Sequence, residues 1–150
     1  MKGLVQRVSE ASVEVDDREV SRIGAGILLL LGVENGDGLD EAKELCRRVL
    51  TYRIFPDEAG RMNRSVLDTG GALLVVPQFT LAADTSSGTR PGFSLAAGPD
   101  IASEMCAGFI AFSRAEMGAE RVKAGLFGAD MKVSLINDGP ATFLLSTRKR

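Results

Sequence analysis

The stretch Gly26-Ile27-Leu28-Leu29-Leu30-Leu31-Gly32-Val33 says most about the fold of this chain. Its apolar run is too short to cross a bilayer as a helix, which takes about 20 residues. A continuous apolar run of this length is typical of a strand that is covered on both faces. Residues 72–76, which follow two glycines, have the same character. We therefore expect two buried strands inside a sheet.

Further strands are expected on both sides of this pair. Residues 4–8 and 11–15 carry alternating or β-branched side chains and meet at Ser9-Glu10. Asp16-Asp17 predicts a turn, after which residues 19–23 return as a strand. The other expected strands are residues 120–124, a half-buried strand through Met131, Val133 and Leu135, and residues 142–146.

Two helices are expected between the strands. The first begins near Leu39, because apolar residues recur at helical spacing, at Ala42, Leu45, Cys46, Val49 and Leu50. The second opens at Gly98-Pro99 and ends near Gly118, with a buried face at Ile101, Met105, Phe109 and Phe112. Residues 83–98 are rich in Ser, Thr, Gly and Pro and predict a long loop, a kind of segment that is often functional.

This order of elements predicts an α+β fold with two main helices. Strands flank each helix and few β-α-β units can be drawn, so a mostly antiparallel or mixed, β-barrel-like sheet is expected. A length of 150 residues predicts a single domain, residues 1–150, with enough chain to bury a core.

Composition excludes several kinds of site. The chain has no histidine, so Ser-His-Asp and Cys-His catalysis are excluded and the commonest zinc ligand is absent. Two cysteines, Cys46 and Cys106, are too few for a disulfide scaffold or a four-cysteine zinc site, and we expect free, buried thiols. The separated acids Asp130 and Asp138 are more simply solvated than metal-bound, so no metal site is expected.

Charge and the N-terminal sequence bear on partners and compartment. The formal net charge is 18 − 20 = −2, which gives no strong field toward nucleic acid or anionic membrane. The short basic tail Arg148-Lys149-Arg150 is most simply a solvated end, although it suits contact with phosphate. No signal-peptide pattern precedes the first strand, and we expect a cytoplasmic protein without membrane contact.

One motif that suits a catalytic site is Val75-Val76-Pro77-Gln78-Phe79-Thr80-Leu81. Proline has no N–H, so Pro77 should end regular strand pairing or lie at an edge. The following backbone N–H groups are then available to point into a cleft, as an oxyanion hole requires. The alternative is a plain strand end whose polar groups cap a turn.

A second motif is Asn137-Asp138-Gly139-Pro140. The simplest interpretation is a tight turn. A cis bond before proline is the minority state, found at about 5–6% of such bonds in folded proteins.

Together these motifs resemble those of the D-aminoacyl-tRNA deacylase family, also called D-tyrosyl-tRNA deacylases. The match covers nearly the whole chain, and several long motifs in the expected order are more specific than either motif alone. The segments that carry it are Val5-Gln6-Arg7-Val8, Ala11-Ser12-Val13, residues 26–33, Arg53-Ile54-Phe55, Met62-Asn63, Gln78-Phe79-Thr80-Leu81, Ala83-Asp84-Thr85, Arg90-Pro91, residues 127–135 and Asn137-Asp138-Gly139-Pro140.

The resemblance implies a homodimer that needs no metal or organic cofactor. Such enzymes hydrolyse the ester joining a D-amino acid, or glycine misattached to tRNA-Ala, to the 3′-terminal adenosine of tRNA. By this resemblance Gln78, Phe79 and Thr80 are catalytic-pocket residues, and the ribose 2′-hydroxyl of the tRNA assists attack by water. The backbone N–H groups of Phe79 and Thr80 would stabilise the reacting carbonyl, and an older interpretation instead makes Thr80 a nucleophile.

The resemblance also implies how chirality is selected. The Gly139–Pro140 bond would be cis and would reach into the pocket of the other subunit, where it excludes an L side chain. Arg7 would hold this motif in place, and we expect Asn137 and Met131 to take part in substrate binding. The active site would then lie at the dimer interface.

Two alternatives remain open, one from a departure from the family pattern and one from other features of the chain. Pro77 stands where the family usually has Ser, and a related group that also removes L-alanine from tRNA has Pro there. That group lacks the arginine matching Arg7, so this chain mixes the two patterns. A deacylase with relaxed chirality is one alternative, and a non-catalytic nucleic-acid-binding homodimer, suggested by the basic tail and the missing catalytic base, is the other.

Overall fold

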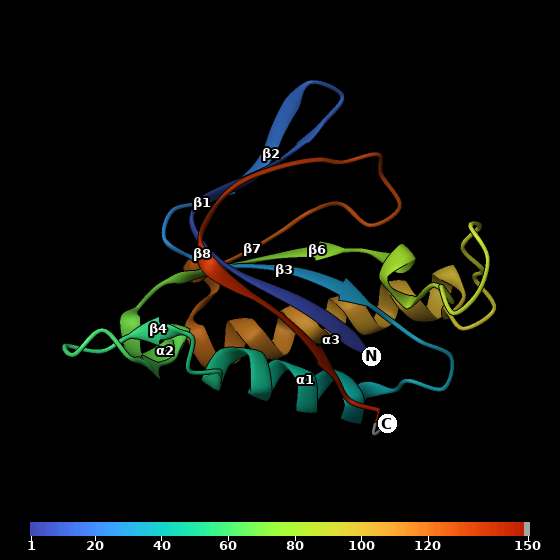
Figure 1. Cartoon of the computed structure of the whole chain (residues 1–150). Coiled ribbons are helices and arrows are strands. Elements are labelled where there is room, and N and C mark those ends of the chain that lie inside the picture. Colours follow the sequence, from blue (N-terminus) through green and yellow to red (C-terminus); the bar gives the residue numbers. More distant parts are fainter. Residues whose placement is uncertain (149–150) are drawn as a thin grey trace.

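The computed structural model describes residues 1–148, in which a curved sheet carries two long helices on one face (Figure 1). The strands are β1 (Lys2–Val15), β2 (Arg18–Ile23), β3 (Gly26–Gly32), β4 (Phe55–Pro56), β5 (Met62–Arg64), β6 (Ala72–Pro77), β7 (Val122–Ala124) and β8 (Lys132–Ser146). The helices are α1 (Leu39–Thr51), α2 (Val66–Thr69) and α3 (Pro99–Met117), with the 3₁₀ turns η1 (Phe79–Ala82) and η2 (Ala119–Arg121).

The main sheet has the strand order β2-β1-β3-β6-β7, and β8 pairs with the other edge of β1. The pairs β3–β6 and β6–β7 are parallel, whereas β1 is antiparallel to each of its three partners. The β1–β2 hairpin and the stretch leading into β8 rise on the face opposite the two long helices, which gives the sheet a barrel-like shape (Figure 1). The expected α+β fold with a mixed, barrel-like sheet is confirmed.

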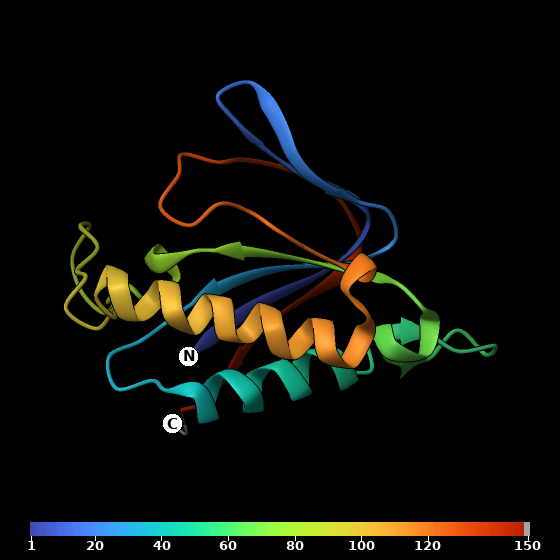
Figure 2. The ribbon, with the colours of Figure 1, turned by 180° about the vertical axis from the view of Figure 1, so that it is seen from behind.

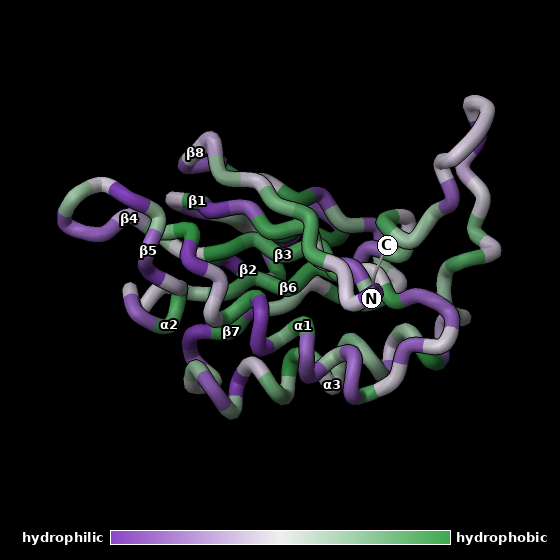
Figure 3. Tube along the Cα trace, turned by 60° about the horizontal axis from the view of Figure 1, so that its bottom comes forward, coloured by the Kyte–Doolittle hydropathy of each residue, from purple (hydrophilic) through white to green (hydrophobic). Residues whose placement is uncertain are grey.

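The two central strands are as the apolar runs predict. All of β3 except Leu30 is buried, and the four residues from Leu73 to Val76 in β6 are buried as well. Their close pairing requires glycine at Gly26, because a Cβ there would lie 1.9 Å from the backbone oxygen of Ala72. Figure 3 shows this apolar centre between the two layers.

Two corrections concern the long strands. Residues 4–8 and 11–15 are not separate strands but one strand, β1, which pairs with β3 through its first half and with β2 through its second. The expected tight turn at Asn137-Asp138-Gly139-Pro140 is also wrong, since these residues lie within the continuous strand β8. There they form a bulge, because residues 138–141 stand between the pairs Val8↔Asn137 and Gln6↔Thr142, opposite Arg7 alone.

The helices confirm the expected buried face of α1 and part of the expected buried face of α3. In α1 the buried residues are those predicted, and hydrogen bonding to the Gly38 backbone lowers the pKa of Glu41 at its N-terminus. In α3 the expected core residue Ile101 is 52% exposed. Met105 and Phe109 are buried as expected and Phe112 is half-buried; the buried residues are Ala102, Met105, Cys106, Phe109, Ser113 and Met117. Figure 2 shows α3 running the length of the sheet, with its N-terminal end beside the 83–98 loop.

Both cysteines are free and buried, as expected. Burial raises the pKa of the Cys46 thiol, and it raises the pKa of Cys106 to about 11. Cys46 Sγ lies 3.4 Å from Ser113 Oγ between α1 and α3.

The first residue and the end of β8 meet beside the β3–α1 loop. The amino group of Met1 lies 3.0 Å from Glu34 Oε1 and 2.7 Å from Asp37 Oδ2. Arg148 pairs with the same two carboxylates, at 3.5 and 3.7 Å. The other two residues of the basic tail, Lys149 and Arg150, lie outside the described residues.

Across residues 1–148, no helix has both the length and the apolar character needed to cross a membrane.

Candidate active site

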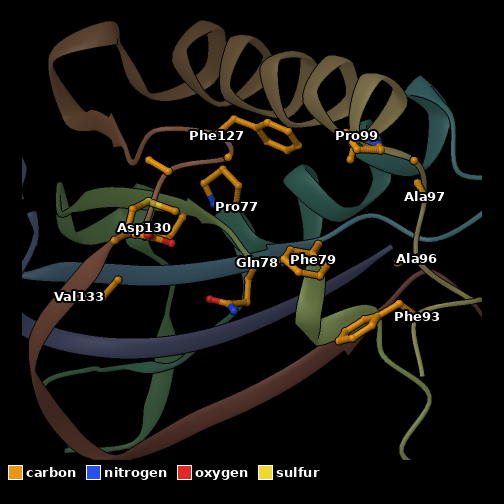
Figure 4. A pocket seen from close by; sticks show the side chains of 16 residues that line it. Pro77, Gln78, Phe79, Phe93, Ala96, Ala97, Pro99, Phe127, Asp130 and Val133 are labelled. Carbon is orange, nitrogen blue, oxygen red and sulfur yellow. The ribbon is translucent and has the colours of Figure 1, made fainter. Parts of the chain in front are cut away.

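A cleft of about 620 Å³ opens where β6 ends (Figure 4). Three segments enclose it: the end of β6 with the start of η1, the end of the 83–98 loop with the first turn of α3, and the stretch that leads into β8. The lining residues are Val76, Pro77, Gln78, Phe79, Phe93, Ala96, Ala97, Gly98, Pro99, Ala102, Phe127, Gly128, Ala129, Asp130, Met131 and Val133.

The end of β6 presents the predicted backbone to this cleft. Pro77 is the last residue of the strand, and Gln78 N–H donates to Leu31 O at 2.8 Å. The chain then turns into η1, in which Leu81 N–H donates to Gln78 O at 3.1 Å. The N–H groups of Phe79 and Thr80 precede that first bond of the turn, where helical N–H groups have no partner within the helix. The prediction that Pro77 ends the pairing is confirmed.

Two side chains of this segment, Gln78 and Thr80, are polar; Gln78 is half-buried and Thr80 is exposed. Gln78 donates from Nε2 to Thr80 Oγ1, and Thr80 is exposed beside the cleft rather than among its lining residues. Asp130 is the one titratable side chain among the lining residues of the described chain. The cleft therefore offers backbone donors and apolar walls, with one carboxylate.

Met131 forms part of the wall together with Pro77. Gly125 fits closely behind both: a Cβ at this position would lie 2.6 Å from Met131 Sδ and 3.7 Å from Pro77 Cδ. Gly125 N–H also donates to Val75 O at 2.9 Å, which fixes this segment to β6. The absence of a side chain at Gly125 thus allows Met131 to lie in the cleft wall.

Phe93 is a cleft residue that the sequence analysis did not single out. Its ring lies 5.4 Å from that of Phe79, centroid to centroid, with the planes inclined by 52°. As an isolated aromatic in a loop of small and polar residues it gave no periodic signal, although its position on the long loop was a hint. Earlier in the same loop, hydrogen bonding from Ser86 lowers the pKa of Asp84.

The remaining predicted residues meet at the bulge of β8. The Arg7 guanidinium donates from Nε to Asp138 O at 2.7 Å and from Nη1 to Ile54 O at 2.6 Å. Asn137 Nδ2 donates to Arg7 O at 3.0 Å. The Gly139–Pro140 peptide bond is cis. Arg7 and Asn137 therefore fasten the bulge to β1 and to the segment after α1.

The predicted site residues thus form two groups. Gln78, Phe79 and Met131 line the cleft, with Thr80 beside it. The second group is at the bulge, where Gly139 and Pro140 are exposed, and within residues 1–148 none of its members lines the cleft; its members are Arg7, Asn137, Gly139 and Pro140. Within residues 1–148, the second group therefore lies outside the cleft that the first group lines.

Comparison with known proteins identifies the family. The family model described as D-Tyr-tRNA(Tyr) deacylase matches residues 4–146. A D-aminoacyl-tRNA deacylase of Marinobacter nauticus is 67% identical over 150 residues, covering 100% of this chain and 96% of the relative. A D-aminoacyl-tRNA deacylase of Xanthomonas euvesicatoria is 56% identical, covering 97% of this chain and 99% of the relative.

Two solved structures share the fold. One, described as c-Myc DNA unwinding element binding protein, has a TM-score of 0.95 at 39% identity and covers 99% of this chain and 100% of its own. Another, described as a probable eukaryotic D-amino acid tRNA deacylase, has a TM-score of 0.82 at 17% identity, covering 96% of this chain and 97% of its own. By the family model and the two bacterial relatives, this chain belongs to the D-Tyr-tRNA(Tyr) deacylase family.

Proposed function

We propose that this protein hydrolyses the ester between a D-amino acid and the 3′-terminal adenosine of tRNA. The observation that carries the proposal is the cleft at the end of β6, in which the backbone of Phe79 and Thr80 stands at the start of a turn. Relatives over the full chain length are named for this reaction. Residues 1–150 would act as a single catalytic domain in the cytoplasm, where tRNA is charged.

The proposed chemistry relies on position rather than on a protein base. Water adds to the ester carbonyl carbon with help from the 2′-hydroxyl of the terminal ribose. The backbone N–H groups of Phe79 and Thr80 stabilise the oxyanion that develops. The bond to the 3′ oxygen then breaks and that oxygen takes up a proton, which releases the amino acid and the tRNA. The absence of histidine is compatible with this scheme.

We propose further that the bulge of β8 selects chirality in the cleft of a second copy. Gly139 and Pro140 are exposed and lie outside their own chain's cleft, which suits a segment that completes a neighbouring site. Arg7 would hold the segment rigid through its bonds to Asp138 and Ile54. A rigid backbone wedge excludes an L side chain by steric clash and admits glycine, including glycine on tRNA-Ala.

The test is a paired assay of the purified protein with D-Tyr-tRNA and L-Tyr-tRNA, with Gly-tRNA-Ala as a third substrate. We expect cleavage of the D-tyrosyl and glycyl esters and no cleavage of the L-tyrosyl ester. Equal inertness toward all three esters would refute the proposed activity. Cleavage of D-Tyr-tRNA without Gly-tRNA-Ala would refute only the glycine part.

Pro77 supports one alternative within the same chemistry. Its ring forms part of the cleft wall, where the family usually has serine, so the wall lacks a hydroxyl and a backbone N–H donor. A deacylase with relaxed chirality would cleave L-Ala-tRNA at a rate comparable to D-Ala-tRNA. Strict rejection of L-Ala-tRNA would remove this alternative.

One structural relative is described as a DNA unwinding element binding protein, which favours nucleic-acid binding. The second alternative is therefore a nucleic-acid-binding homodimer without catalysis. This alternative predicts binding of single-stranded nucleic acid with no ester cleavage by the wild-type protein. Measurable D-Tyr-tRNA hydrolysis would exclude it.

A further inference from the structure

Two exposed aromatic rings stand at one end of the cleft. Phe79 is 58% exposed and Phe93 is 45% exposed, and both contribute to the lining. Figure 4 places them beside each other at the end of the cleft away from Asp130 and Val133. Apolar surface exposed beside a binding cleft commonly marks an interaction site.

The backbone around Phe93 is fixed on both sides. On the N-terminal side, Gly92 and Asp84 exchange two backbone hydrogen bonds, of 2.7 and 3.0 Å. On the C-terminal side, Asn35 donates from Nδ2 to Ser94 O at 2.6 Å and from its backbone N–H to Leu95 O at 2.9 Å. Phe93 is therefore presented from an anchored position, so little conformational entropy is lost when a ligand packs on its ring.

We propose that Phe93, together with Phe79, forms a stacking surface for the nucleobase that precedes the terminal adenosine of the tRNA. This inference rests on the proposed function, because it takes the aminoacylated adenosine to occupy the cleft. The single-stranded 3′ end then leaves the cleft past the two exposed rings, so that its next base stacks on them. Proteins that bind single-stranded RNA stack unpaired bases on aromatic side chains in this way.

The chemistry of the two rings favours a flat base over a charged group. Of the lining residues in the described chain, Asp130 alone is titratable, and it lies at the other end of the cleft. Arg90, exposed on the same loop, adds a positive charge that favours an adjacent phosphate. Stacking on this surface would be tolerant of sequence, because every base has a flat face.

The test compares two substrates, D-Tyr-tRNA and the minimal ester D-Tyr-adenosine, which has no preceding nucleotide. We expect Phe93→Ala to raise the KM for D-Tyr-tRNA by at least about fivefold with little change in kcat. Phe93→Trp should keep the wild-type KM, since it retains a stacking ring. With D-Tyr-adenosine, the effect of Phe93→Ala on KM should be clearly smaller than with D-Tyr-tRNA, because this substrate has no preceding base to stack. Leu95→Ala is the matched control, an exposed apolar residue of the same loop that does not line the cleft.

Two outcomes would overturn the inference: an equal loss by Phe93→Ala on both substrates, or a changed oligomeric state of this variant in analytical ultracentrifugation. A second measurement does not depend on catalysis. An RNA ending in CCA, with 2-aminopurine in place of the penultimate base, should lose fluorescence on binding wild type but not Phe93→Ala. Equal quenching by both proteins would also overturn the inference. Failure of the wild type to cleave either ester would instead refute the proposed function.

Discussion

Thr80 is the side chain that distinguishes the two possible mechanisms. Its hydroxyl lies at the start of η1 and accepts a hydrogen bond from Gln78 Nε2. A threonine nucleophile needs a base to take its proton, and the cleft-lining residues provide no base next to it. We therefore expect Thr80→Ala to keep kcat for D-Tyr-tRNA within about tenfold of wild type.

The control for this variant is Thr89→Val, an exposed threonine on the 83–98 loop. Circular dichroism would confirm that both variants are folded. A loss of about a thousandfold or more in a folded Thr80→Ala protein would contradict the backbone mechanism and favour a threonine nucleophile.

The two thiols should be inert in the folded protein. Burial raises the pKa of Cys106 to about 11, and that of Cys46 shifts in the same direction, so both stay protonated at pH 8. A thiol reagent should label neither cysteine at pH 8 under native conditions and both in denaturant. Rapid labelling of the native protein would contradict this.

The same shift has a consequence for stability. The unfolded thiols ionise near their ordinary pKa, whereas the folded ones remain neutral. The free energy of unfolding therefore has its full value below that ordinary pKa. Between pH 9 and pH 11 the free energy of unfolding should fall with rising pH. Replacing Cys106 with Ala should weaken this dependence, which urea unfolding at several pH values would measure.

At the level of single residues, the sequence predicts those structural features that follow from the chemistry of the residue itself. Pro77 lacks an N–H, so the end of β6 and the exposed backbone after it were predictable. Phe93 was not, because its role depends on the loop bringing it 5.4 Å from Phe79. The burial of Ile101 was predicted wrongly, since helical spacing placed Met105 and Phe109 correctly but does not fix where the edge of the buried face of α3 lies.

Among the elements, the pairing of β3 with β6 depends on one glycine. A Cβ at Gly26 would meet three backbone atoms of Ala72, at 1.9 to 2.8 Å, and backbone cannot move as a side-chain end does. We expect Gly26→Ala to lower the free energy of unfolding by about 3 kcal/mol or more.

Gly24→Ala is the matched control, because a Cβ there would meet nothing within 4 Å. It should change stability by less than about 0.5 kcal/mol. Chemical denaturation of both variants measures the difference. Equal stability of the two variants would show that β3 and β6 can move apart at Gly26 at little cost in free energy.

The strands also show where sequence patterns mislead at this scale. Alternation in β1 is interrupted at Ser9-Glu10, but the interruption marks a change of partner from β3 to β2 rather than a break. Asn-Asp-Gly-Pro has the composition of a turn, yet here β8 continues beyond it. The extra residues are absorbed as a bulge against Arg7, and only the long-range pairing with β1 reveals this.

For the whole molecule, the separation of the two groups of site residues is the central observation. The element order was enough to predict the α+β class and the barrel-like sheet. It was not enough to show that the cleft and the bulge lie apart, because that depends on how β8 pairs along β1. If the bulge serves the cleft of a second copy, mixing two defective variants should reveal it.

We expect the Arg7→Ala protein to have a loosened bulge and therefore to cleave L-Tyr-tRNA. We expect the Ala96→Trp protein to be inactive, because the larger side chain blocks its cleft. In a mixed dimer, the one open cleft belongs to the Arg7→Ala chain and faces an intact bulge. Adding excess Ala96→Trp protein should therefore suppress L-Tyr-tRNA cleavage while D-Tyr-tRNA cleavage persists. Arg22→Ala, exposed on β2, is the control for loss of an arginine.

Unchanged L-Tyr-tRNA cleavage after subunit exchange would contradict an active site shared between copies. Exchange itself would be verified by mass spectrometry of differently tagged chains, so that a negative result is informative.

The pairing of β1 with β8 also means that the sheet cannot be completed until the end of translation. Lys2 pairs with Ser146, so one edge of the first strand stays open until almost all of the residues between them have left the ribosome. The unpaired N–H and C=O groups of an open strand edge can pair with another nascent chain and cause aggregation. Premature termination upstream of β8 would therefore leave an aggregation-prone fragment with an unpaired strand edge rather than a shorter, folded enzyme.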